Sequence, residues 1–128
     1  MEPDLDALRG ELTALADQTR ESLVAVADRF GLGVGRLAAL LGTDAAALSD
    51  PGSWDGELAG RLAATEALSE FLVARIDVDG TRDVIDTPAH AFDGATLFEV
   101  LAADRCQHAR AVYEAAFGLR PPLQTPQS

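Results

Sequence analysis

The sequence contains no lysine and only one cysteine, one tryptophan and one tyrosine among its 128 residues. The single cysteine, Cys106, excludes a disulfide within the chain and is typical of a reducing compartment, which predicts a cytoplasmic protein. Aromatic residues make up 5% of the chain, and this scarcity disfavours a strand-rich fold. No segment approaches the ~20 apolar residues of a membrane span, and the first four residues lack the positive end of a signal peptide. We therefore expect no contact with a membrane.

Acidic residues dominate the charged positions. Asp and Glu number 21 against 10 basic residues, all of them arginine, so the net charge is −11. Such a charge repels phosphate backbones and membrane surfaces and favours a partner with a positive cleft, although solubility alone is an alternative explanation. Apolar residues form 48% of the chain and are mostly Ala, Leu and Val, which favours packed helices.

Apolar residues recur at helical spacing along most of the chain. The predicted fold is all-α, with six or seven helices in one compact unit. We expect a helix-turn-helix-like N-terminal region over residues 1–56, a C-terminal helical region over 57–118 and an extended tail over 119–128. The predicted helices cover residues 4–30, with a break near Gln18 and Thr19, and residues 34–41, 44–49, 55–76, 96–103 and 104–117.

Four leucines near the N-terminus, Leu5, Leu8, Leu12 and Leu15, are spaced by three and four residues. This spacing fits the packing of a helix on the core of its own chain. It also fits the seam of a homodimer, although about two heptads are too few to establish a coiled coil. Both interpretations stay open at the level of sequence.

Polar residues mark several helix starts. Thr96 and Glu99 have the spacing of a capping box, and Asp104 and Gln107 repeat it before the last helix. Thr43 is the expected N-cap of the helix at residues 44–49.

The segment Asp77–Thr81 has two interpretations. Asp79 and Gly80 between Val78 and Thr81 are typical of a β-hairpin turn, whereas Thr81 could cap a short helix that ends near Ile85. We favour the short helix, because strands here would be isolated. The acids of this region do not match a calcium-binding loop, since Gly80 is not at the required position.

Residues 37–49 have the layout of a helix-turn-helix, in which Leu37, Leu41 and Leu48 would face the core and Gly42 would form the turn. The chemistry of DNA reading is missing. No Arg or Lys occurs from Leu37 to Gly60, so the segment offers no cation to phosphates or bases. We expect a structural role for this degenerate element and weak or absent DNA binding.

Catalytic and metal-binding patterns are also missing from the sequence. No Ser, Thr or Cys has a recognisable activating neighbourhood, and there is no glycine-rich phosphate loop. The two histidines, His90 and His108, are eighteen positions apart without further ligands at zinc spacing. We therefore expect neither an enzyme nor a metal or other cofactor.

The most informative segment is Thr87–Leu101. It begins with a compact turn that contains Pro88 and Gly94 and leads into the helix capped by Thr96. A rigid, weakly polar turn suits docking on another protein better than catalysis. With the helix order before it, the segment resembles the toxin-binding region of the Xre/MbcA/ParS antitoxins, although Ala89 replaces the usual Asn and Leu97 the usual Pro.

The resemblance implies an antitoxin of a toxin–antitoxin system that binds a RES-domain toxin and blocks its NAD-consuming pocket. Under it, Thr87 and Pro88 match the Thr-Pro of the toxin-binding segment. Pro88 and Gly94 would fix the docking turn, which would display His90 and Phe92. Arg120 with the tail beyond would plug the toxin pocket. The alternatives are a helix-turn-helix transcriptional regulator and a stand-alone helical interaction module with an unknown partner.

Overall fold

The computed structural model describes residues 5–116 of the chain. Within this range the protein is built from helices alone, which confirms the all-α prediction. The α-helices are α1 (Leu5–Glu11), α2 (Asp17–Phe30), α3 (Val34–Leu40), α4 (Ala45–Leu48), α5 (Gly56–Asp86), α6 (Leu97–Ala102) and α7 (Cys106–Ala116), with 3-10 turns η1 (Pro51–Ser53) and η2 (His90–Phe92). None of the helices in this range has the length and apolar character that crossing a membrane requires.

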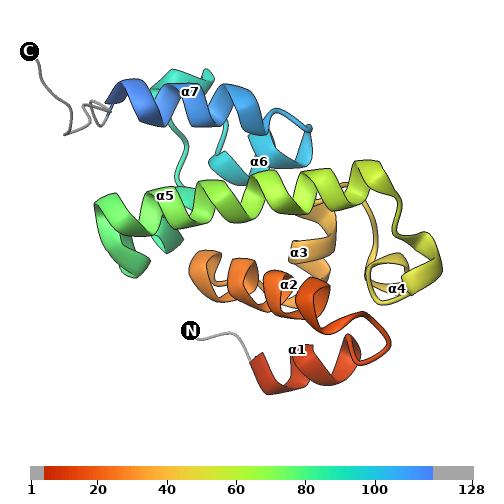
Figure 1. The fold of residues 1–128 in the computed structure, drawn as a ribbon. Coiled ribbons are helices and arrows are strands. Elements are labelled where there is room, and N and C mark those ends of the chain that lie inside the picture. The colour runs from red at the N-terminus through yellow and green to blue at the C-terminus, as the bar shows by residue number, and fades with distance from the viewer. Residues whose placement is uncertain (1–4, 117–128) are drawn as a thin grey trace, which may run out of the picture.

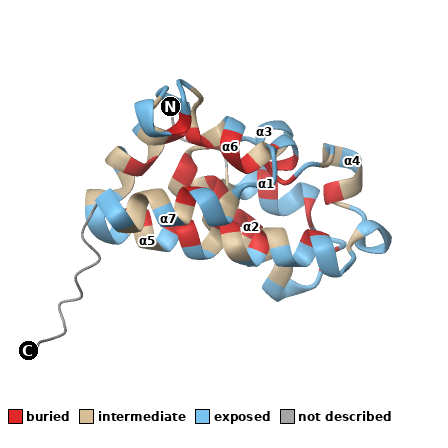
Figure 2. Ribbon diagram, turned by 90° about the horizontal axis from the view of Figure 1, so that it is seen from above, coloured by how far each residue is buried: buried red, intermediate tan, exposed pale blue. Residues whose placement is uncertain are grey.

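The long helix α5 runs through the middle of the molecule and separates two groups of helices (Figure 1). On one side α2 packs along α5, and α1 packs on α2. On the other side α6 and α7 pack on α5 and on each other, and α6 also contacts α3. The buried residues lie along the surfaces that these helices share (Figure 2).

The N-terminal leucines pack inside the chain. Leu8, Leu12 and Leu15 are buried, and Leu5 is half-buried against the same core. The break in the first predicted helix is real, but it follows Glu11 and so lies earlier than Gln18. The structure therefore gives these leucines an intramolecular role, as the first of the two interpretations predicts.

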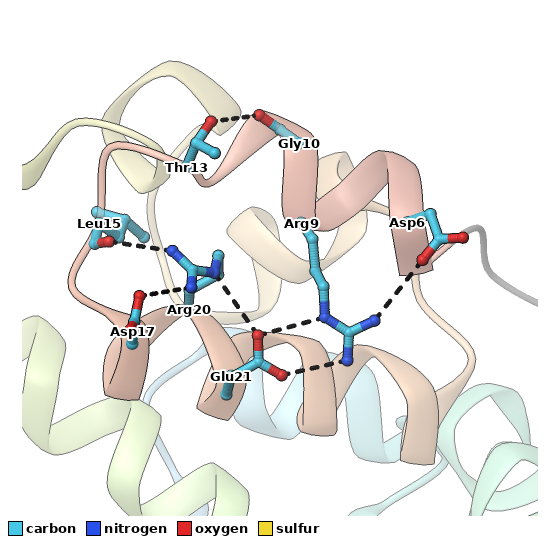
Figure 3. Close-up of polar contacts among 8 residues, drawn as sticks. All are labelled: Asp6, Arg9, Gly10, Thr13, Leu15, Asp17, Arg20 and Glu21. Atoms are coloured by element: carbon cyan, nitrogen blue, oxygen red, sulfur yellow. Dashed lines mark hydrogen bonds and ion pairs between the residues drawn. The ribbon is translucent and has the colours of Figure 1, made fainter.

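Charged side chains tie α1 to α2 across this break. Arg9 donates to both carboxylate oxygens of Glu21, at 3.2 and 3.1 Å, and within α2 Arg20 donates to Asp17 at 2.6 Å (Figure 3). The hydrogen bond from Arg9 lowers the pKa of the Glu21 carboxyl below its ordinary value of 4.5. The pair lies at the surface, with Arg9 44% and Glu21 51% exposed, so it orients α1 more than it stabilises the fold.

The helix α5 is interrupted at Ile76 and Asp77, where Asp77 has a φ of 59°. The Asp77 carboxylate accepts a hydrogen bond from the backbone N–H of Gly80 at 2.9 Å and so begins a new helical segment that ends at Asp86. The hairpin interpretation was wrong, and the short helix is present. Thr81 is not its cap, because its hydroxyl is buried and donates to the carbonyl of Asp77.

The other predicted caps have mixed outcomes. The capping box of Thr96 and Glu99 is present in both directions, with Glu99 N–H donating to the Thr96 hydroxyl at 3.1 Å. Asp44, and not Thr43, caps α4. Asp104 does not cap α7: its φ of 62° places it at the C-terminal end of α6, where its N–H donates to the carbonyl of Leu101.

Two arginines of α5 complete the ends of other helices. Arg61 donates to the carbonyls of Leu40 at 3.2 Å and Leu101 at 2.8 Å, which lie at the C-terminal ends of α3 and α6. Arg82 donates to the carbonyl of Asp28 near the end of α2, at 2.6 Å. These donors satisfy carbonyls that a helix terminus otherwise leaves without partners.

A glycine with positive φ accompanies each of these arginines. Gly31 has a φ of 70°, and a Cβ there would lie 3.2 Å from Cδ of Arg82. Gly42 has a φ of 79°, and a Cβ there would overlap the guanidinium of Arg61. Glycine at these two positions therefore allows both the left-handed backbone and the close approach of the arginine side chains.

Candidate protein-binding site

The turn between α5 and α6 is held by its own backbone. The N–H of Ala89 donates to the carbonyl of Ala95 at 3.0 Å, and the N–H of Gly94 donates back to the carbonyl of Ala89 at 3.0 Å. These bonds close a small loop around η2. The Thr87 hydroxyl donates to the carbonyl of Asp83 at 2.7 Å and so joins the loop to the end of α5.

Two successive left-handed residues reverse the chain after η2. Asp93 has a φ of 57° and Gly94 a φ of 90°. Glycine adopts this conformation without the steric cost that a Cβ imposes. The expectation that Gly94 shapes the turn therefore has a direct physical basis.

Phe92 points into the molecule. Its side chain is buried, and its ring makes edge-to-face contacts with the rings of His108 and Tyr113, each with a centroid distance of 5.8 Å. The expectation that the turn displays Phe92 was wrong. The one helical turn of η2 cannot point His90 and Phe92 the same way, and burying the larger apolar ring is favourable.

The remaining predicted residues of the turn lie on its exposed surface, together with Ala91 and Asp93. Thr87, Pro88, His90 and Gly94 are all exposed and lie together on one short loop. Arg120 lies outside the described residues. The structure thus unites four of the six predicted residues on one surface and gives Phe92 the role of anchoring that surface to α7.

A pocket of about 330 Å³ lies beside the turn. Ala91 and Asp93 line it from the turn, Glu99 from α6, Arg105 from the segment before α7, and His108 from α7. Its rim therefore carries acidic and basic groups on an apolar floor. Residue spacing alone did not identify Arg105 or His108 as neighbours of the turn, because their position depends on how α7 packs on α5 and α6.

The helix-turn-helix-like region has the predicted core contacts. Leu37, Leu41 and Leu48 are buried. The second helix of the pair, α4, is a single four-residue turn whose N-terminus is capped by the carboxylate of Asp44. This carboxylate lies at the end that a recognition helix presents to DNA, where a negative charge is unfavourable.

No cluster of three or more metal-ligating side chains occurs within residues 5–116. The lone Cys106 is half-buried, and desolvation raises the pKa of its thiol above the ordinary value of 9.0. Desolvation likewise raises the pKa of the hydroxyl of Tyr113, whose ring contacts Phe92. Neither group is activated for nucleophilic attack at neutral pH.

The candidate site is thus the exposed surface of the Thr87–Gly94 turn and the adjoining pocket. A scan against protein-family models found no family that matches this chain, and searches of curated proteins and of solved structures found no match either.

Proposed function

We propose that the protein is an antitoxin-like interaction protein that neutralises an NAD-consuming RES-domain toxin by direct contact. The observation that carries the proposal is the Thr87–Gly94 turn, whose exposed residues are held by internal hydrogen bonds and by the buried ring of Phe92. A surface fixed before binding loses less conformational entropy when a partner docks.

The charge of the protein supports a positively charged partner. Most arginines of the described chain already serve internal contacts, for example Arg36 with Asp86 and Arg29 with Glu70. The acids in excess therefore face solvent without a countercharge. A pocket that binds the pyrophosphate of NAD must be positive, and an acidic protein is attracted to it over long range.

DNA reading is not part of the proposal. Within residues 5–116 the helix-turn-helix-like element presents the carboxylate of Asp44 at the start of α4, and the exposed Asp50 and Asp55 follow nearby. A surface of this charge cannot neutralise phosphates.

The proposal is tested with the purified protein and a RES-domain toxin encoded beside its gene. NAD consumption by the toxin is expected to stop at an equimolar ratio. The variants Pro88→Gly and His90→Ala are expected to weaken inhibition at least ~10-fold, about 1.4 kcal/mol of binding. Both positions are exposed, so thermal unfolding should change little.

A matched control is Glu11→Ala, an exposed residue at the end of α1, which should inhibit as the wild type does. An unchanged rate of NAD loss with the wild-type protein would refute the proposal. Full inhibition by both turn variants would show that the turn is not the contact.

A further inference from the structure

A trough runs along the surface between α5 and α7, away from the turn. Its wider part has a volume of about 280 Å³ and continues into a narrower part of about 130 Å³, and the two share Ala64, Cys106 and Gln107. The helices α5 and α7 lie side by side along it (Figure 1). It shares no lining residue with the pocket beside the turn.

The floor of this α5–α7 trough on the α5 side consists of small residues. Gly56, Gly60 and Ala64 repeat every four residues, so they lie on one face of the helix. A Cβ placed on Gly56 or Gly60 would meet no atom within 4 Å. The open space and the helical spacing together leave room for the backbone of another helix to approach closely.

A buried hydroxyl in the trough has no partner. Thr65 lines the wider part, and its residue exposure is 3%. Across residues 5–116 no hydrogen bond involves the Thr65 hydroxyl, whereas those of Thr81 and Thr87 donate to carbonyls one turn earlier. Buried polar groups are nearly always hydrogen-bonded, so this hydroxyl calls for a polar group from outside the chain.

The end of the trough near the start of α5 is acidic. Glu57 and Asp104 line it, and Asp55 lies next to Glu57 in the adjoining hollow. Arg61 also lines this end, but its guanidinium contacts the carbonyls of α3 and α6 and forms a 3.5 Å ion pair with Asp104 and not with Glu57. A positive group on a partner would therefore meet Glu57 without a competing arginine.

The direction of the two helices fixes how a third would lie. Cys106 faces the Gly60–Ala64 part of α5, and Arg110 stacks on Phe71 further along, so α5 and α7 run parallel. An added helix antiparallel to both would align its dipole favourably with theirs. Its C-terminal end, where basic residues are favoured, would then lie over Glu57.

We propose that the α5–α7 trough binds an α-helix of a partner protein that carries small residues and one hydroxyl on its contact face and arginine or lysine at its C-terminal end. Two copies of this chain are a poorer fit, because each has a net charge of −11. The proposal goes beyond the toxin contact at the turn and does not depend on it.

The test uses Cys106 as a reporter, since it lies in the trough and is the only cysteine of the chain. The probe is a synthetic helical peptide of about 20 residues, long enough to be helical alone. Every fourth residue of the peptide lies on its contact face. These positions hold Ala, except for one that holds Ser, and the C-terminal end carries two Arg. Saturating peptide is expected to slow maleimide alkylation of Cys106 at least ~5-fold, a loss of accessible thiol.

Gly60→Leu fills the trough, and its Cβ meets no atom within 4 Å, so the fold should be retained. Binding should fall at least ~10-fold in this variant. Glu57→Gln should weaken binding of the peptide that carries the two Arg. It should not change binding of a second peptide in which both Arg are replaced by Gln. The matched control is Gly35→Leu on α3, where a Cβ is equally unobstructed and binding should be unchanged.

Three results would overturn the proposal. The first is an alkylation rate that the peptide does not change, and the second is undiminished protection in Gly60→Leu. The third is protection of Cys106 that rises with protein concentration in the absence of peptide, because a second copy would then cover the trough. The readout is independent of NAD consumption, so this proposal and the toxin contact can fail separately.

Discussion

Replacing Arg61 tests whether its hydrogen bonds to the C-terminal carbonyls of α3 and α6 stabilise the fold. The side chain is 17% exposed and donates from one nitrogen, Nη2, to the carbonyls of Leu40 at 3.2 Å, Leu101 at 2.8 Å and Ala102 at 3.4 Å. Arg61→Met keeps the apolar stem and removes all of these donors. The experiment therefore isolates the polar contribution of the guanidinium.

The expected loss can be worked out from these contacts. A hydrogen bond with a charged donor contributes about 1.5–3 kcal/mol, and only the 2.8 Å bond to Leu101 has full strength. The ion pair with Asp104 adds no more than about 1 kcal/mol, because that carboxylate is 58% exposed. We expect Arg61→Met to lower the free energy of unfolding by about 3 kcal/mol.

Two control variants separate the contributions. Asp104→Asn removes the ion pair and keeps a residue that tolerates the positive φ of 62°, so its effect should stay below about 1 kcal/mol. Arg75→Met removes an exposed arginine that lies over the Phe71 ring and should also stay below about 1 kcal/mol.

The assay is urea denaturation, with the midpoint compared at constant slope. A change in slope would mean that the variant alters the unfolded ensemble or breaks two-state behaviour. If Arg61→Met loses no more stability than Arg75→Met, the carbonyl contacts do not stabilise the fold and the reasoning is refuted.

The remaining predictions concern the glycines, the anchor of the turn and one carboxylate. Gly94→Ala should lower the free energy of unfolding by about 1 kcal/mol, because Ala is strained at a φ of 90°. Gly42→Ala should lower it more, because the new Cβ also displaces the guanidinium of Arg61. Equal losses of the two variants in thermal melts would contradict this. Phe92→Ala should lose about 3–4 kcal/mol in urea denaturation, since it empties a buried position, and a loss under 1 kcal/mol would mean that the ring is not an anchor. The Glu21 pKa measured by NMR should lie below 4.5 and should return toward 4.5 in Arg9→Gln. Any stability from the pair is therefore complete above pH 4.5 and is lost as the pH falls through the lowered pKa. A Glu21 pKa that is unchanged in Arg9→Gln would rule this out.

Local sequence signals predicted the local structure. The spacing of apolar residues gave the helices, and the Thr96–Glu99 pair gave the start of α6, because both depend on residues within one or two turns. Two of the errors were local, since Asp44 and Asp77 cap the helices expected to begin at Thr43 and Thr81. A third arose where a distant residue intervened. Asp104 has the spacing of a capping box, but it lies at the end of α6 and its carboxylate pairs with Arg61.

In the candidate site too, features set by single residues were predictable and features set by distant packing were not. Pro88 and Gly94 identified the turn, because their backbone restrictions are properties of single residues. The inward direction of Phe92 depended on where Tyr113 and His108 would lie, which follows from the packing of α7 and not from the turn. The trough between α5 and α7 was likewise invisible, since Gly60 and Cys106 are far apart in the sequence.

The arginine contacts of α5 have a consequence for the order in which the chain can fold. Arg61 reaches carbonyls 21 and 40 positions away in the sequence, and Arg82 reaches one 54 positions away. A growing chain that ends before Gly60 therefore holds α2 and α3 with incomplete C-terminal turns. We therefore expect native protection of α2 and α3 from hydrogen exchange to appear in the same kinetic phase as that of α5 and α6, which pulse-labelling hydrogen exchange would measure.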